Sequence, residues 1–115
     1  MSRNLSLYLT DILNSISKIQ RYTAGLSYEE LIQDELVLDA VIHNLQIIGE
    51  ATKQIPDSLR SQHPQIEWKA IAGMRDIIAH AYFSVNTRIV WNVIQQNLQP
   101  LKDCIEYLQQ TENID

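Results

Sequence analysis

The chain has 115 residues, of which 45% are hydrophobic and 20% charged, and its formal net charge is −5. This length fits one domain with a single buried core, so residues 1–115 are predicted to form one domain. No apolar run is long enough to span a membrane. An acidic balance of this size also argues against a protein that holds nucleic acid by unselective charge alone.

The first half of the sequence predicts two long helices. Apolar residues recur at spacings of three and four over residues 5–23, as on one face of an amphipathic helix, and Gly25 is placed to end it. Ser27 and Glu30 form a capping-box pattern at the start of the next helix. The apolar pattern then continues until Pro56, which predicts one helix of about 27 residues, roughly 40 Å long.

The second half predicts a short element and two further helices. A short helix or turn lies between Pro56 and Pro64, and a third main helix covers about residues 66–79. Asn86 is a suitable N-cap for the last helix, in which Pro100 removes one backbone hydrogen bond and is expected to cause a kink. The sequence therefore predicts an all-α, up-and-down bundle of four main helices plus a short helix.

Positive charge is concentrated in the middle of the chain. Residues 1–52 carry a net charge of −4 and residues 89–115 a net charge of −3, whereas residues 53–88 carry +2. This basic region surrounds the stretch MRDIIAHAYF, residues 74–83, which places charged groups inside an apolar run. We therefore expect an anionic ligand there, and not a long polyanion held by charge alone.

The stretch at 74–83 brings together Arg75, Asp76, His80 and Tyr82. Residues four apart on a helix share a face, so Asp76 lies one turn behind His80. A carboxylate that is hydrogen-bonded to one imidazole nitrogen fixes the tautomer of the ring and leaves the other nitrogen for proton transfer. The Arg75 guanidinium can hold a phosphate through two parallel hydrogen bonds. Together these groups suit metal-free cleavage of RNA. That reaction needs a base for the 2′-hydroxyl, an acid for the leaving oxygen and a cation that binds the phosphate.

A purely structural interpretation fits the same spacing. Arg75 and Asp76 can form a surface ion pair, and a protonated His80 is favoured at a helix C-terminus. The residues alone leave both interpretations open.

Other polar residues favour structural roles. Cys104 lies on an apolar helical face and is interpreted as a core residue, which cannot form an internal disulfide. His43 is interpreted as a helix-surface histidine, and Glu50 as a solvated or ion-paired residue, although it can also face a cleft. The spacing of His, Cys and acidic residues matches no metal-binding motif, so neither metal nor cofactor is expected. The apparent lack of an export signal favours the cytoplasm.

The motif Arg75-Asp76-x3-His80 resembles that of HEPN-domain ribonucleases, in which the residue after the arginine is typically polar. The fuller form, which includes Tyr82, is similar to that of the HepT toxins of HepT/MntA toxin–antitoxin pairs. The resemblance covers nearly the whole chain through DILNSISKIQRYTAGLS (residues 11–27), NLQIIGEATKQIP (residues 44–56), PQIEWKAIAGMRDIIAHAYF (residues 64–83) and the Val90-Trp91 region before Leu98-x-Pro100.

The resemblance implies an all-helical HEPN domain that forms a homodimer, with two motifs facing one cleft. It implies a metal-independent ribonuclease, either an endoribonuclease or a tRNA-trimming enzyme, in which Arg75 and His80 are catalytic. It also implies a partner, an MntA-like nucleotidyltransferase antitoxin that attaches AMP to Tyr82, and a higher hetero-oligomer with it is conceivable. Many relatives have an acidic residue between the histidine and the tyrosine, where this chain has Ala81. This departure leaves the acid–base chemistry intact and leaves the docking of the modifying partner open.

One rival function comes from a different class of protein. A catalytically silent helical dimer would bind a nucleotidyltransferase and cut nothing. The acidic pI favours this binding module, whereas the intact Arg75, Asp76 and His80 favour the enzyme.

Overall fold

The computed structural model describes the backbone of residues 3–80 and 85–112, and the side chains of residues 4–74 and 85–112. Within these ranges every regular element is a helix, so the all-α prediction is confirmed. The elements are α1 (Arg3–Thr23), α2 (Tyr28–Gln33), α3 (Glu35–Lys53), α4 (Asp57–Arg60), α5 (Trp68–His80), α6 (Thr87–Asn92), the π-helix η1 (Val93–Asn97) and α7 (Leu98–Glu112). Four of them, α1, α3, α5 and α7, are long, as predicted.

The connection between α1 and α2 follows the sequence signals. Gly25 has a φ of +78°, which a residue with a side chain rarely adopts, and it follows the last turn of α1. The Ser27 hydroxyl accepts the Glu30 amide, and the Glu30 carboxylate accepts the Ser27 amide. The predicted capping box is therefore confirmed, and it fixes the direction in which α2 leaves the turn.

The prediction of one long helix after Ser27 was wrong, because the helix breaks at Asp34. The Asp34 backbone is extended (φ −98°, ψ 90°), and its amide donates to the carbonyls of Glu30 and Leu31, which ends α2. Its side chain accepts the Val37 amide at 3.1 Å and so begins α3. One aspartate therefore satisfies backbone groups of both helices, which the apolar spacing does not reveal.

The short element and the third main helix lie where they were predicted. Leu59 is the buried residue of α4, and the α4–α5 connection ends with Trp68, whose indole donates to the His63 carbonyl at 2.9 Å. Trp68, Ile71, Ala72 and Met74 are all buried. These side chains pack the first half of α5 into the common core. Because α5 is one continuous helix, this packing also sets the direction of its second half.

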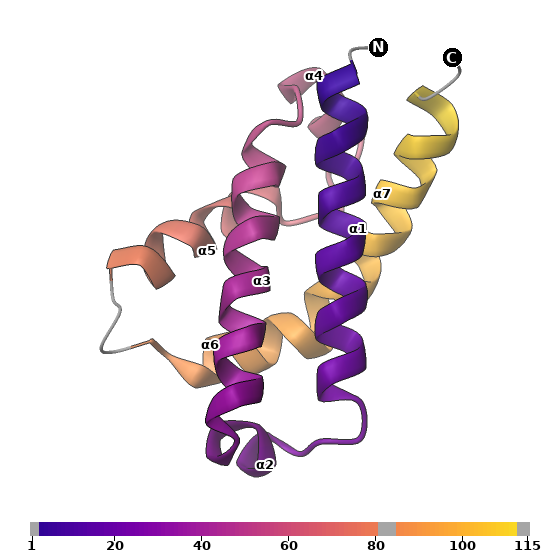
Figure 1. Ribbon diagram of the computed structural model, residues 1–115. Coiled ribbons are helices and arrows are strands. Elements are labelled where there is room, and N and C mark those ends of the chain that lie inside the picture. Colours follow the sequence, from indigo (N-terminus) through magenta and orange to yellow (C-terminus); the bar gives the residue numbers. More distant parts are fainter. Residues whose placement is uncertain (1–2, 81–84, 113–115) are drawn as a thin grey trace.

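The last helical stretch is interrupted just before Pro100. The Asn86 side chain accepts the amides of Arg88 and Ile89, which confirms it as an N-cap. The chain then widens into η1, where the Leu98 amide donates to the Val93 carbonyl five residues earlier. Figure 1 shows the direction of the chain changing between α6 and α7. Helix α7 runs through Pro100, and the irregular segment lies before it as η1, so the kink predicted at Pro100 itself stays a prediction.

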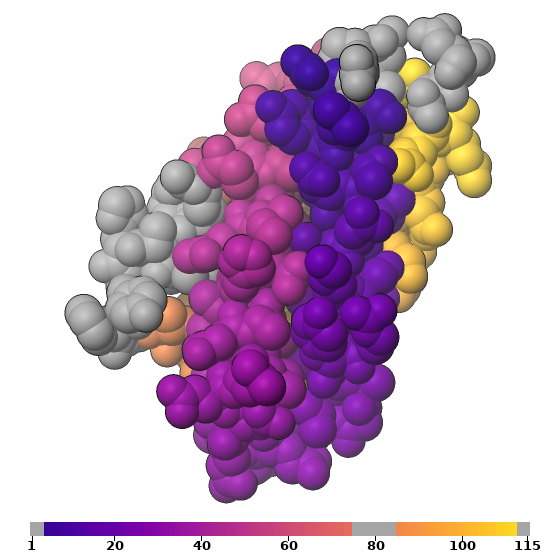
Figure 2. Space-filling view, in the orientation of Figure 1, coloured from indigo at the N-terminus to yellow at the C-terminus, as the bar shows by residue number. Residues whose placement is uncertain are grey.

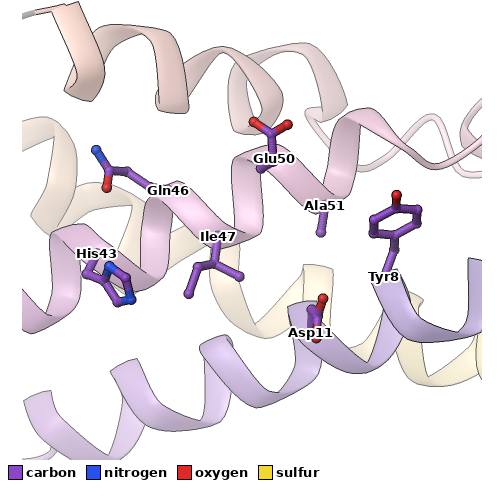
Figure 3. A pocket seen from close by; sticks show the side chains of 7 residues that line it. All are labelled: Tyr8, Asp11, His43, Gln46, Ile47, Glu50 and Ala51. Atoms are coloured by element: carbon purple, nitrogen blue, oxygen red, sulfur yellow. The ribbon is translucent and has the colours of Figure 1, made fainter. Parts of the chain in front are cut away.

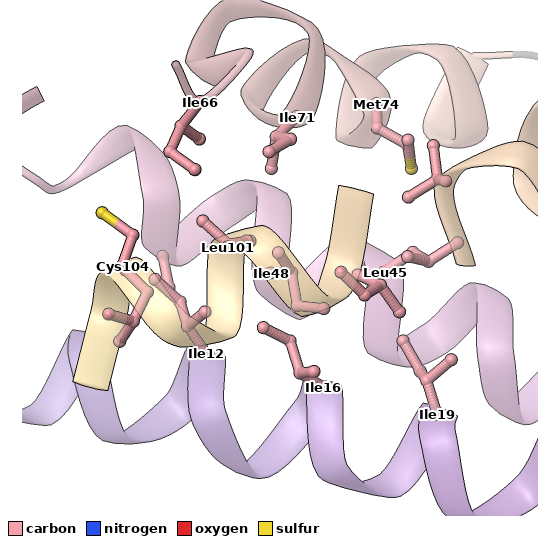
Figure 4. Packing of buried hydrophobic residues seen from close by; sticks show 14 of the residues in the cluster. Ile12, Ile16, Ile19, Leu45, Ile48, Ile66, Ile71, Met74, Leu101 and Cys104 are labelled. Atoms are coloured by element: carbon pink, nitrogen blue, oxygen red, sulfur yellow. The ribbon is translucent and has the colours of Figure 1, made fainter. Parts of the chain in front are cut away.

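The core lies between α1, α3 and α7, with α5 and α6 against one side. Figure 2 shows α1 and α3 side by side over one face of the molecule. Figure 4 shows Ile16 and Ile19 of α1 beside Ile48 and Leu45 of α3, with Ile12 of α1 nearer Leu101. Ile71 and Met74 extend this cluster onto α5, and Leu101 and Cys104 extend it onto α7. Among the described residues, no helix is long and apolar enough to cross a membrane.

Candidate functional site

Helix α5 carries three of the four residues predicted to form the site. Arg75, Asp76 and His80 all belong to its continuous α-helical backbone. Asp76 and His80 therefore stand one turn apart on the same side of the helix, as the sequence predicted. Their side chains, and Tyr82 as a whole, lie outside the described residues. The contacts predicted among these four groups stay predictions.

The register of α5 makes Arg75 unusual. The buried residues of the first half are Trp68, Ile71, Ala72 and Met74. Arg75 follows Ile71 by four residues and Ala72 by three, so its backbone position continues the buried row. A helix that only filled the core would carry an apolar residue there. The Arg75 side chain lies outside the described residues, so its role stays a prediction.

A cleft of about 430 Å³ lies between α1 and α3 (Figure 3). Tyr8 and Asp11 of α1 line one wall, and His43, Gln46, Ile47, Glu50 and Ala51 of α3 line the other. In Figure 3, Glu50 and Ile47 project from opposite sides of α3. His43 is exposed, which agrees with its interpretation as a surface histidine. None of the described lining residues belongs to α5.

A second cleft, of about 400 Å³, lies beside α5 itself. It is bordered by Lys69, Gly73 and Met74 on α5, and by residues of α6 and η1 that include Ile89 and Asn92. A Cβ atom added at Gly73 would meet no atom within 4 Å. One side of the helix that carries Arg75 and His80 is therefore open, and sequence reasoning did not foresee this opening.

Cys104 has the structural role expected of it. Cys104 is buried, and desolvation by burial raises the pKa of its thiol from 9.0 to about 11. The thiol is therefore protonated at neutral pH, which confirms a core residue and not a nucleophile. Among the described side chains, no three His, Cys, Asp or Glu residues gather as a metal site would require.

The fold and the sequence motif together define a class of protein. It is a helical bundle with a charged motif, of residue types that suit acid–base chemistry, near the end of one helix. Comparison with protein families gives the particular assignment. The family model "Ribonuclease HepT-like" matches residues 12–108. The chain belongs to the HepT-like ribonuclease family, which the sequence resemblance predicted.

Relatives of similar length support this assignment. A Thermococcus cleftensis protein named "Probable ribonuclease HepT" is 39% identical over 94% of this chain and 98% of its own length. A Caldanaerobacter subterraneus protein named "Putative RNase" is 37% identical over 91% of this chain and 94% of its own. A "Putative RNase" of Methanocaldococcus jannaschii is 38% identical over 87% of this chain and 86% of its own. No solved structure matches the chain.

Proposed function

We propose that this protein is a metal-independent ribonuclease and the toxin of a toxin–antitoxin pair of the HepT/MntA type. The observation that carries the proposal is the family match over residues 12–108, which includes the whole motif from Arg75 to Tyr82. The unbroken helical backbone from Arg75 to His80 supports it, because the chemistry needs Asp76 and His80 one turn apart. The proposed location is the cytoplasm, where an RNA substrate is present.

In the proposed reaction, His80 takes the proton from a ribose 2′-hydroxyl, whose oxygen attacks the neighbouring phosphorus. The bond from phosphorus to the 5′-oxygen breaks, a 2′,3′-cyclic phosphate forms, and the leaving oxygen receives its proton from a protonated His80 imidazole in the cleft. Arg75 binds the phosphate oxygens, on which negative charge increases in the transition state. Asp76 is a positioning residue that holds the imidazole of His80 in the required tautomer. Two such motifs face one cleft in a homodimer.

Regulation is proposed to act at Tyr82. An MntA-like nucleotidyltransferase would join the Tyr82 oxygen to the α-phosphorus of ATP and release pyrophosphate. The resulting adenylate would place a bulky anion next to Arg75 and His80. It would block the phosphate site sterically and occupy its cation, which is a simple way to silence the enzyme.

The first experiment tests the ribonuclease assignment with matched histidine variants. Purified protein is incubated with total tRNA and with messenger RNA in excess EDTA, and products are separated on denaturing gels. We expect cleavage by the wild type, a loss of about 10²–10⁴-fold in rate for His80→Ala, and little change for His43→Ala, which alters an exposed histidine of α3. Equal activity of His80→Ala and the wild type would refute the catalytic assignment.

The rival function, a silent binding module, is favoured by one observation, the net charge of −5. Co-expression with an MntA-like nucleotidyltransferase separates the two. The toxin proposal expects the intact mass to rise by one or more adenylates and Tyr82→Phe to prevent the rise. It also expects growth arrest when the unmodified protein is expressed alone. A protein that binds the transferase, keeps its mass and does not arrest growth would support the binding module.

A further inference from the structure

A cluster of one cation and two aromatic rings joins α2 to α6. The Arg88 guanidinium carbon lies 3.9 Å from the centre of the Tyr28 ring. The Trp91 ring meets Tyr28 edge to face, with centroids 6.0 Å apart and an interplanar angle of 68°. The Tyr28 hydroxyl is 2.6 Å from the Thr87 hydroxyl. Trp91 and Thr87 therefore hold the Tyr28 ring in place, and the ring supports the guanidinium.

Among the described residues, nothing occupies the guanidinium of Arg88 except the Tyr28 ring. Arg88 is exposed, and no carboxylate or carbonyl in the described part of the chain accepts a hydrogen bond from its side chain. Arg60, in contrast, is paired with Asp57. Glu30 of α2 bonds the Ser27 amide, so it serves the capping box. Contact with the ring limits the positions of the Arg88 side chain, while its N–H groups meet no acceptor among the described residues.

The cluster lies close in the chain to the proposed catalytic motif. Arg88 follows His80 by eight residues, and an extended chain of that length reaches at most about 28 Å. OB folds bind about 4–16 nucleotides of a single strand each, and a strand of such a length would be long enough to contact both places here. Figure 1 shows α6 crossing α3 in the half of the molecule that contains α2. Arg88 also belongs to the one basic region of the sequence, residues 53–88.

We propose that Arg88, held against Tyr28, binds a backbone phosphate of the RNA strand whose cleaved bond lies at His80. The proposal rests on the ribonuclease function and adds a substrate contact outside the motif. A planar guanidinium whose position is already restricted loses less side-chain entropy on binding a phosphate than a free lysine would. It gives the protein one localised phosphate site, whereas the net negative charge of the protein as a whole would repel RNA.

A purely structural role for Arg88 makes a different prediction. The Tyr28–Thr87 contact and the Tyr28–Trp91 ring pair already connect α2 to α6 without the guanidinium. If Arg88 only strengthened that connection, replacing it would lower thermal stability and leave the salt dependence of RNA binding unchanged. If it binds a phosphate, the salt dependence changes, because each neutralised phosphate releases counterions.

The test measures binding of a fluorescein-labelled, mixed-sequence 20-nucleotide RNA by anisotropy, in the His80→Ala background and across a salt series. We expect Arg88→Ala to weaken binding about tenfold at low salt. The slope of log K against log salt should become less steep by about 0.7, the value of one phosphate on a single strand. Arg88→Lys should keep the slope and bind less tightly than the arginine.

Matched variants locate the effect. Arg21 is an exposed arginine over the ring of Tyr22, with 5.3 Å to the centroid, so Arg21→Ala removes the same charge from a similar pair on α1. It should weaken binding much less than Arg88→Ala. Tyr28→Phe, which keeps the ring and loses the hydroxyl, should bind nearly as the wild type, whereas Tyr28→Ala should bind more weakly.

The outcomes separate this proposal from the ribonuclease proposal. If the wild type cleaves RNA and Arg88→Ala shows unchanged KM and salt slope, the Arg88 site is refuted and the ribonuclease stands. If the wild type binds RNA through Arg88 and never cleaves it, the Arg88 site stands and the ribonuclease fails. Equal losses for Arg21→Ala and Arg88→Ala would mean unselective charge and would refute the site, as would the absence of RNA binding.

Discussion

Two regions of the molecule bury their apolar side chains to different degrees. In the three-helix body, formed by α1, α3 and α7, Ile16, Leu45 and Leu101 are at most 1% exposed. In the α5–α6 arm, formed by α5, α6 and η1, Ile71 and Ile94 are 5% and 9% exposed, while Val90 is 2% exposed. The arm also borders the open cleft at Gly73 and carries the whole described part of the proposed motif.

This difference indicates that one region mainly stabilises the fold and the other mainly serves the proposed function. Fully buried helices exchange their amides only when the whole domain unfolds, whereas less completely packed elements open locally at lower free energy. Functional segments generally come from the less stable end of this range. The body is expected to hold the fold, while the arm presents charged groups to a ligand and remains able to adjust.

Identical isoleucine truncations in the two regions give the largest expected effect. Ile16→Ala should lower the free energy of unfolding by about 4–5 kcal/mol, because the cavity it creates is closed on all sides. Ile71→Ala should cost nearer 2 kcal/mol, the lower end for such changes, since Ile71 borders the open cleft and its surroundings can relax. Urea unfolding measures both. Equal losses would contradict the distinction between body and arm.

Removing an N-cap should have a smaller and differently distributed effect. Asp34→Ala removes the cap of α3 and should lower the free energy of global unfolding by about 1 kcal/mol. Asn86→Ala removes the cap of α6 and should instead act locally. Hydrogen exchange should then speed up in the first turn of α6, with little change in the urea midpoint. A global loss from Asn86→Ala equal to that from Asp34→Ala would show that the arm unfolds together with the body.

The two caps also illustrate how far the sequence could predict the fold. Ser27 and Asn86 were recognisable because each stands at the start of an apolar pattern. Asp34 was not, since Leu31 and Leu38 fall seven residues apart and their spacing is consistent with one continuous helix. The π-helix was beyond prediction in a similar way. Pro100 indicates that a backbone hydrogen bond is missing, but tertiary packing decides whether the chain responds with a kink or a wider turn.

The proposed site was predictable only in part. The positions of Arg75, Asp76 and His80 on one helix follow from helical periodicity and agree with α5. The cluster of Tyr28, Arg88 and Trp91 was not predictable, because its members lie up to 63 residues apart in the sequence and meet only through the packing of α2 on α6. Periodicity describes neighbours along a helix, whereas this contact depends on tertiary structure.

Alanine at two glycines should give effects of opposite sign. Gly25 has a φ of +78°, so Gly25→Ala should cost about 1 kcal/mol through backbone strain at the end of α1. Gly73 lies inside α5 with free space around its missing Cβ, so Gly73→Ala should stabilise the protein by roughly 0.5–1 kcal/mol. Thermal unfolding of both variants checks the signs. A destabilising Gly73→Ala would mean that the cleft beside α5 is closed in solution.

The smallest expected effect comes from ionisation of the Cys104 thiol in the body, and it appears only at high pH. Burial raises the pKa of its thiol from 9.0 to about 11, so the unfolded chain ionises first as the pH rises. Below pH 9 both states hold the proton and the thiol has no pH-dependent effect. Between about pH 9 and pH 11 the unfolded state binds fewer protons, so the free energy of unfolding falls.

Because tyrosines and lysines titrate in the same range, the informative quantity is the difference between the wild type and Cys104→Ala. Urea unfolding from pH 8 to pH 11 should show a steeper decline for the wild type, with a roughly constant offset between the two proteins below pH 9. Iodoacetamide should also label the folded wild type slowly at pH 8, since labelling requires the thiolate and exposure of α7. Parallel declines together with fast labelling would show that the body opens as readily as the arm.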